Sequence, residues 1–108
     1  MPSPTPLDMK IAPDARAKMV GFLSRVTDYE PTLCLMKQTD GRWSYGSYAP
    51  ENIEVVGSEL ARLGHELLYL VDGLVVAIPQ FQFLPELSGK LLTLRGKELV
   101  VVDRAPGI

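Results

Sequence analysis

The chain has 108 residues, a formal net charge of −2 and a hydrophobic fraction of 46%, which predicts one globular domain around a single core. Its basic residues are scattered, so the sequence lacks the positive patch that nucleic-acid binding requires. One cysteine excludes an internal disulfide and is typical of a reducing compartment. No apolar run approaches the ~20 residues that span a bilayer, and the N-terminus lacks the features of a secretory signal. We therefore expect a cytoplasmic protein that binds neither nucleic acid nor membrane.

The first six residues, M-P-S-P-T-P, contain three prolines. We expect residues 1–6 to form a disordered leader and residues 7–108 to form the single domain. Leu7, Met9 and Ile11 alternate with polar residues, a pattern typical of a short strand.

A helix is predicted from Pro13 to about Val26. Proline suits the first helical turn, and Asp14 lies favourably near the positive end of the helix dipole. Apolar residues recur at helical spacing on one face. They are Ala15, Met19, Phe22, Leu23 and Val26. We expect this to be the only long helix of the protein.

Two predicted strands, residues 32–38 and 42–48, flank Asp40-Gly41, a strong hairpin signal. If those two residues form the loop, Gln38 faces Trp43, Met36 faces Tyr45 and Cys34 faces Ser47. That register places Cys34, Met36, Trp43 and Tyr45 on one face. Pro50 is expected to end this unit.

A short helix of one or two turns is predicted over residues 58–63, followed by a second hairpin across Asp72-Gly73. Its strands, residues 66–71 and 74–78, are apolar on both faces. A strand pair of this kind must be covered twice, by the helix and by another sheet or another subunit. The surplus apolar face therefore predicts self-association.

Residues 81–87 are apolar and are expected to form a short helix or a loop. A third hairpin, residues 91–95 with 98–103, turns at Gly96-Lys97 and sets Arg95 opposite Glu98. Together these elements predict an α+β fold: one N-terminal helix packed on a mostly antiparallel or mixed β-structure built from three hairpins.

The sequence offers few groups for chemistry. Cys34 and His65 are its only thiol and imidazole, far apart, so we expect no metal site and no cofactor. No nucleophile elbow or phosphate-binding glycine loop is present. Cys34 is expected to be a buried, inert thiol, whereas His65 either neutralises a helix end or acts in ligand binding or proton transfer.

Three aromatic residues, Trp43, Tyr45 and Tyr48, cluster near Arg42 in the first hairpin. They either pack in the core or stack on a ligand or partner. With His65 they form the site of a competing hypothesis, a small-molecule-binding protein or weak enzyme. That hypothesis predicts that all five side chains line one concavity.

Four segments follow one another in a characteristic order. They are a helix introduced by a short strand at residues 11–26, a strand and glycine turn at residues 33–48, the segment V-D-G-L-V-V at residues 71–76 and L-S-G-K-L-L at residues 87–92. This order resembles that of the HesB-like A-type carriers of iron–sulfur cluster assembly. It implies a HesB-like architecture. The family's cluster-ligand cysteines have no counterpart here: residues 39–43 lack a thiol, and the chain after Asp103 reads R-A-P-G-I. We therefore expect a fold without the cluster, because a cluster normally needs four thiolates.

These observations favour a non-enzymatic binding or scaffold protein. Its expected partner is a second copy of the chain or another protein.

Overall fold

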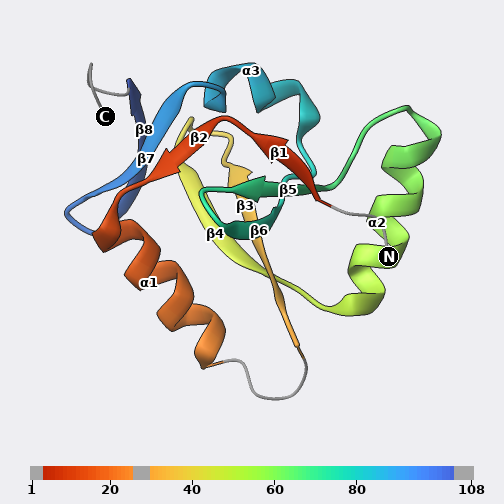
Figure 1. Ribbon diagram of the computed structural model, residues 1–108, viewed down its shortest axis with the longest axis horizontal. Coiled ribbons are helices and arrows are strands. Elements are labelled where there is room, and N and C mark those ends of the chain that lie inside the picture. The colour runs from red at the N-terminus through yellow and green to blue at the C-terminus, as the bar shows by residue number, and fades with distance from the viewer. Residues whose placement is uncertain (1–3, 26–29, 104–108) are drawn as a thin grey trace.

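The strands of this protein form one sheet, and the two strands at its opposite edges follow each other directly in the sequence. The computed structural model describes residues 4–25 and 30–103, and within them it contains three α-helices and an eight-stranded mixed sheet (Figure 1). The elements are β1 (Thr5–Leu7), β2 (Met9–Ile11), α1 (Pro13–Ser24), β3 (Thr32–Lys37), β4 (Trp43–Tyr48), α2 (Pro50–Arg62), β5 (Leu68–Val71), β6 (Leu74–Ala77), the 3₁₀ turn η1 (Phe81–Phe83), α3 (Leu84–Leu87), β7 (Lys90–Arg95) and β8 (Glu98–Asp103). The predicted α+β class and the three antiparallel hairpins are confirmed.

The strand order is β1-β5-β6-β3-β4-β8-β7-β2. Only Asp8 separates β1 from β2, and these strands pair in parallel with β5 and β7 respectively. Figure 1 shows β1 and β2 as one bent ribbon that crosses from the β5 side of the molecule to the β7 side. The N–H of Gly89 donates to the carbonyl of Asp8 at 2.5 Å, which fixes the bend. The chain therefore closes the sheet on itself.

The closed sheet encloses the larger of two hydrophobic clusters. All eight strands contribute to this interior, and α1 and α3 supply Met19 and Leu87. A smaller cluster lies on the outer face of the sheet, where α2 packs. Its buried members are Cys34, Leu60, Leu67 and Ala77.

The N-terminal helix agrees with the prediction in position and in face. It begins at Pro13 and ends at Ser24; residue 26 lies outside the described residues. Ala15 and Met19 are buried, and Phe22 and Leu23 pack against the interior cluster. Thr5 and Pro6, which we expected to belong to the leader, are part of β1 and pair with Tyr69 and Leu70 of β5. Residues 1–3 of the expected leader lie outside the described residues.

The second helix is longer than predicted. We expected one or two turns over residues 58–63, whereas α2 has 13 residues and begins at Pro50, which starts the helix rather than only ending the hairpin. Ile53, Val56 and Leu60 recur at helical spacing and pack on the outer cluster. This packing outweighs the weak helix propensity of valine and glycine at residues 55–57. No helix within residues 4–25 and 30–103 has the length and apolar character to cross a membrane.

The register of the first hairpin differs by one residue from the prediction. Lys37 faces Trp43 and Leu35 faces Tyr45, because the loop holds three residues, 39–41. The N–H of Gln38 donates to the carbonyl of Arg42 at 2.6 Å, and Gly41 adopts a φ of 89°, as a three-residue loop requires.

A one-residue shift in register changes which residues of the two strands share a face, because successive side chains alternate between the faces of a sheet. Trp43 and Tyr45 therefore face the interior, while Cys34 and Met36 lie on the outer face beneath α2. The expectation that these four residues share one face is wrong.

The other two hairpins have the predicted registers. Val71 faces Leu74 across Asp72-Gly73, both with positive φ, and Arg95 faces Glu98. The residues from 81 to 87 form η1 and α3, the helical alternative.

The outer face of β5 and β6 is covered in part. Leu68 and Ala77 belong to the cluster beneath α2. Leu70 and Val75, which face each other in the hairpin, keep 39% and 43% of their surface exposed. The outer face of this hairpin, which we expected another sheet or another subunit to cover, is thus covered in part by α2. A small apolar patch of Leu70 and Val75 remains exposed.

Candidate functional site

A groove of about 580 Å³ opens where β4 and β8 separate. We call it the β8 groove. It is lined by Lys37, Arg42, Trp43, Glu86, Lys90 and residues 98–103, with Gly41 at the hairpin loop. These residues come from the ends of β3 and β4, from α3, from the start of β7 and from the length of β8.

The groove exists because β4 and β8 overlap very little. β8 pairs with β7 from Glu98 to Asp103, but its register with β4 consists of the single pair Trp43↔Leu99. The two strands are antiparallel, and β4 begins at Trp43. Beyond Leu99, β8 therefore runs past the start of β4, and no strand formed by the described residues lies beside it on that side.

The main chain of β8 presents hydrogen-bonding groups to this open side. In an antiparallel ladder, hydrogen-bonded pairs alternate with non-hydrogen-bonded pairs, and the residues that flank a two-residue loop form a hydrogen-bonded pair. Arg95↔Glu98 is that pair here, so Val100 and Val102 direct their N–H and C=O groups toward β7. Val101 and Asp103 consequently direct theirs into the β8 groove.

The edge of β3 near the groove is covered by a side chain. β3 pairs with β6 only at Leu33 and Cys34. Farther along, the N–H of Lys37 donates to Oε1 of Gln80 at 2.6 Å, and Nε2 of Gln80 donates to the carbonyl of Lys37 at 3.0 Å. The amide of Gln80 thus makes the two hydrogen bonds that a neighbouring strand would make.

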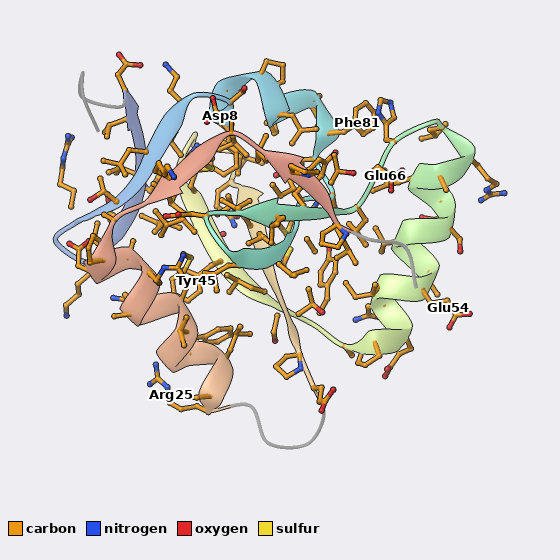
Figure 2. The ribbon with its side chains drawn as sticks, viewed as in Figure 1. Asp8, Arg25, Tyr45, Glu54, Glu66 and Phe81 are labelled. Atoms are coloured by element: carbon orange, nitrogen blue, oxygen red, sulfur yellow. The ribbon has the colours of Figure 1, made fainter. Side chains whose placement is uncertain are left out.

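One side chain of β4 packs against α1. The rings of Tyr45 and Phe22 meet edge to face with centroids 5.3 Å apart, and Figure 2 shows Tyr45 between the sheet and this helix. Unlike the end of β3, the main chain of β8 beyond Leu99 has no pairing strand among residues 4–25 and 30–103.

Three ion pairs surround the β8 groove. Lys37 Nζ lies 2.5 Å from Oε1 of Glu86, Arg42 Nη1 lies 2.9 Å from Oε1 of Glu98, and Lys90 pairs with Asp103. Hydrogen bonding and charge from Lys90 lower the pKa of the Asp103 carboxyl. Asp103 is therefore a carboxylate throughout the neutral range.

The inner wall of the groove combines a cation with aromatic rings. Trp43 and Phe83 pack edge to face with centroids 6.3 Å apart. The ammonium of Lys37 lies 4.9 Å from the centroid of Phe83 and 6.0 Å from that of Trp43. Ring faces attract a cation at such distances, so Lys37 is held by the rings and by Glu86 together.

The five residues predicted as a site are not brought together. Arg42 and Trp43 line the β8 groove. Tyr45 packs against the interior cluster and Tyr48 against the outer one. His65 stacks on Phe81 with ring centroids 3.6 Å apart, on the α2 side of the molecule, away from β8 (Figure 2). The single concavity that the competing hypothesis required is not formed by these side chains.

Cys34 is buried, as predicted, with 2% of its surface exposed. Burial raises the pKa of its thiol because the thiolate loses hydration, and a hydrogen bond from Tyr48 opposes part of that rise. Burial also raises the pKa of Tyr48, and the nearby Cys34 adds to the effect. The pair contributes to packing beneath α2.

Sequence reasoning missed the charged residues that surround the groove: Lys37, Glu86, Lys90, Glu98 and Asp103. The available signal was weak, since Glu98 and Asp103 only bracket the apolar run L-V-V-V of one strand. Among residues 4–25 and 30–103, no group of three or more His, Cys, Asp or Glu side chains is placed to hold a metal ion.

The segments behind the HesB-like resemblance occupy definite places in the fold. V-D-G-L-V-V forms the turn and strands of the β5–β6 hairpin, and L-S-G-K-L-L joins α3 to β7. Comparison of the chain with family models, with curated proteins and with solved structures finds no match. A HesB-like descent therefore stays a proposal that rests on these sequence motifs.

Proposed function

We propose that this protein is a non-enzymatic binding protein that takes an extended segment of a partner protein as an additional strand beside β8. The observation that carries the proposal is the open edge of β8 in the β8 groove, where Val101 and Asp103 direct main-chain groups to a lined depression instead of a strand.

Strand addition suits this geometry because main-chain hydrogen bonds supply affinity and the surrounding side chains supply selectivity. The open stretch, Val100 to Asp103, is about 13 Å long at ~3.3 Å per residue, so it accommodates roughly four residues of a partner. An exposed edge is normally protected in proteins. The end of β3 is covered by Gln80 in this one, so the opening at β8, which is lined by charged and aromatic side chains, favours a binding role.

Amide hydrogen exchange followed by NMR tests the proposal. The probe is a short capped peptide of alternating threonine and valine, which is neutral and strand-forming. Because Val101 and Asp103 direct their N–H groups into the groove, we expect both amides to become protected when the peptide binds. The amides of Val100 and Val102 already face β7 and should change little.

Proline at position 101 provides the matching variant. Val101→Pro removes a donor that faces the groove and leaves the hydrogen bonds to β7 in place, so peptide binding should be lost while the fold is kept. Val101→Thr retains the N–H and serves as the control. Equal peptide affinity in the two variants, or unchanged exchange at Val101 and Asp103 in the parent, would contradict strand addition.

Self-association is a second candidate function. It is favoured by the patch of Leu70 and Val75 on the outer face of β5 and β6, which α2 leaves exposed. Burying such side chains against a second copy removes apolar surface from water. A sedimentation experiment, described below, tests this candidate separately from the groove.

A further inference from the structure

We infer that the partner strand is basic: the β8 groove selects an extended segment that carries lysine or arginine side chains. This inference rests on strand addition at β8 and specifies the chemistry of the occupant.

The first support is the difference in exposure within the ion pairs. The Lys37 side chain is 22% exposed, whereas its partner Glu86 is 47% exposed. The Lys90 side chain is 36% exposed, whereas Asp103 is 87% exposed. In both of these pairs the cation lies deeper and the carboxylate is more accessible, whereas Arg42 and Glu98 in the third pair are exposed to a similar extent, 64% and 57%. An incoming strand therefore meets the carboxylates of Glu86 and Asp103 before their cations.

The second support is the capacity of these carboxylates. A carboxylate has about four lone-pair sites and can accept from more than one donor. Lys37 is already held by Glu86 and by the rings of Phe83 and Trp43. Glu86 therefore keeps accepting capacity for a second cation, while Lys37 has little freedom to reach an acidic ligand.

Fluorescence anisotropy with labelled, capped peptides tests the inference. The probes are short peptides of alternating lysine and valine, glutamate and valine, and threonine and valine. We expect the lysine peptide to bind tightest and the glutamate peptide weakest, with the difference shrinking as salt is added.

Three variants, Glu86→Gln, Glu98→Gln and Asp103→Asn, remove the accessible carboxylates one at a time. Each should weaken binding of the lysine peptide by about twofold to fivefold, the range of exposed ion pairs, and leave binding of the threonine peptide unchanged. Glu54→Gln is the matched control, because Glu54 projects from α2 on the side of the molecule away from β8 (Figure 2). It should have no effect on either peptide.

The two levels of the proposal fail in different ways. If the glutamate peptide binds as tightly as the lysine peptide and Val101→Pro weakens both, the basic preference is wrong and strand addition stands. If no peptide binds, or if Val101→Pro leaves binding of the lysine peptide intact, strand addition itself is wrong.

Discussion

The β5–β6 and β7–β8 hairpins have similar local sequences and different surroundings. Each consists of two apolar strands joined by a two-residue loop that contains a glycine. β5 pairs with β1, and β6 pairs with β3, so both sides of the β5–β6 hairpin have a neighbouring strand. β7 pairs with β2 over Lys90 to Leu92, but β8 meets β4 at one residue pair. Whether a hairpin is enclosed in the sheet or accessible to a partner is therefore decided by the strands that pair with its outer edges, more than by its own sequence.

The turns of the two hairpins also differ: the β5–β6 turn is bound to neighbouring elements, and the β7–β8 turn is exposed. The Oδ2 atom of Asp72 accepts the N–H of Ile11 at 3.1 Å, and its carboxylate lies 3.8 Å from the cations of Lys10 and Arg16. The β5–β6 turn is thus attached to β2 and to α1. The loop at Gly96-Lys97 is exposed and lies at the far end of its hairpin.

The largest expected loss of stability comes from a substitution in the hydrophobic interior, to which both hairpins contribute side chains. Leu92 of β7 has 2% of its surface exposed. Leu92→Ala should lower the free energy of unfolding by about 2–5 kcal/mol, because it leaves a cavity in the closed sheet. Urea denaturation measures the loss. Val100→Ala on the outer face of β8 is the control and should cost less than about 1 kcal/mol; an equal cost would mean that this face is buried.

The attachment of the β5–β6 turn should contribute the next largest effect. Asp72→Ala removes the acceptor for Ile11 and places alanine at a φ of 47°, so we expect a loss of about 1–3 kcal/mol in urea denaturation. Asp40→Ala, in the exposed loop of the first hairpin, is the comparison and should cost about 1 kcal/mol or less. Equal losses would show that the contacts of Asp72 contribute no more than those of a surface turn.

The exposed patch on β5 and β6 should have a smaller effect, visible only at high protein concentration. In sedimentation velocity we expect the parent to associate as its concentration rises, and the double variant Leu70→Lys, Val75→Lys to remain a monomer. Val20→Lys, a similarly exposed valine on α1, is the control and should associate as the parent does. A parent that stays monomeric at every concentration would exclude self-association through this patch.

The smallest expected effect is electrostatic and lies at the end of β8. Because Lys90 lowers the pKa of Asp103 in the folded protein, the pair stabilises the fold above the ordinary aspartate pKa of about 3.9. That contribution is lost as the pH falls through the lowered value. Lys90→Gln should raise the pKa of Asp103 toward its ordinary value in an NMR titration. Lys97→Gln, in the loop, should leave the pKa of Asp103 unchanged. An equal rise in both variants would mean that the net charge of the protein, and not the pairing with Lys90, lowers this pKa.

Local signals predicted the elements that depend on local chemistry. Turn glycines located all three hairpins, and helical spacing from Ala15 to Leu23 located α1 and its buried face. Two elements depend on distant contacts and were therefore less visible. α2 is stabilised by packing of Ile53 and Val56 on the sheet, and β1 is defined by its parallel pairing with β5.

The candidate site was harder to predict because it depends on relative strand lengths. Whether Val101 has a neighbour is decided by where β4 begins relative to β8, and the sequence of neither strand contains that information. The aromatic cluster was divided for a related reason. A loop of three residues instead of two moved Trp43 and Tyr45 to the interior and away from Cys34.

The closure of the sheet by β1 and β2 also constrains the order of events during synthesis. These strands leave the ribosome first, yet their neighbours are β5 and β7; Ile11 and its hydrogen-bond partner Asp72 stand 61 positions apart. Contacts of such long range slow folding, because a large loop must close before they form. The nascent chain can complete its hairpins one by one, but β1 must wait until β5 has been synthesised, and β2 must wait until β7 has been synthesised.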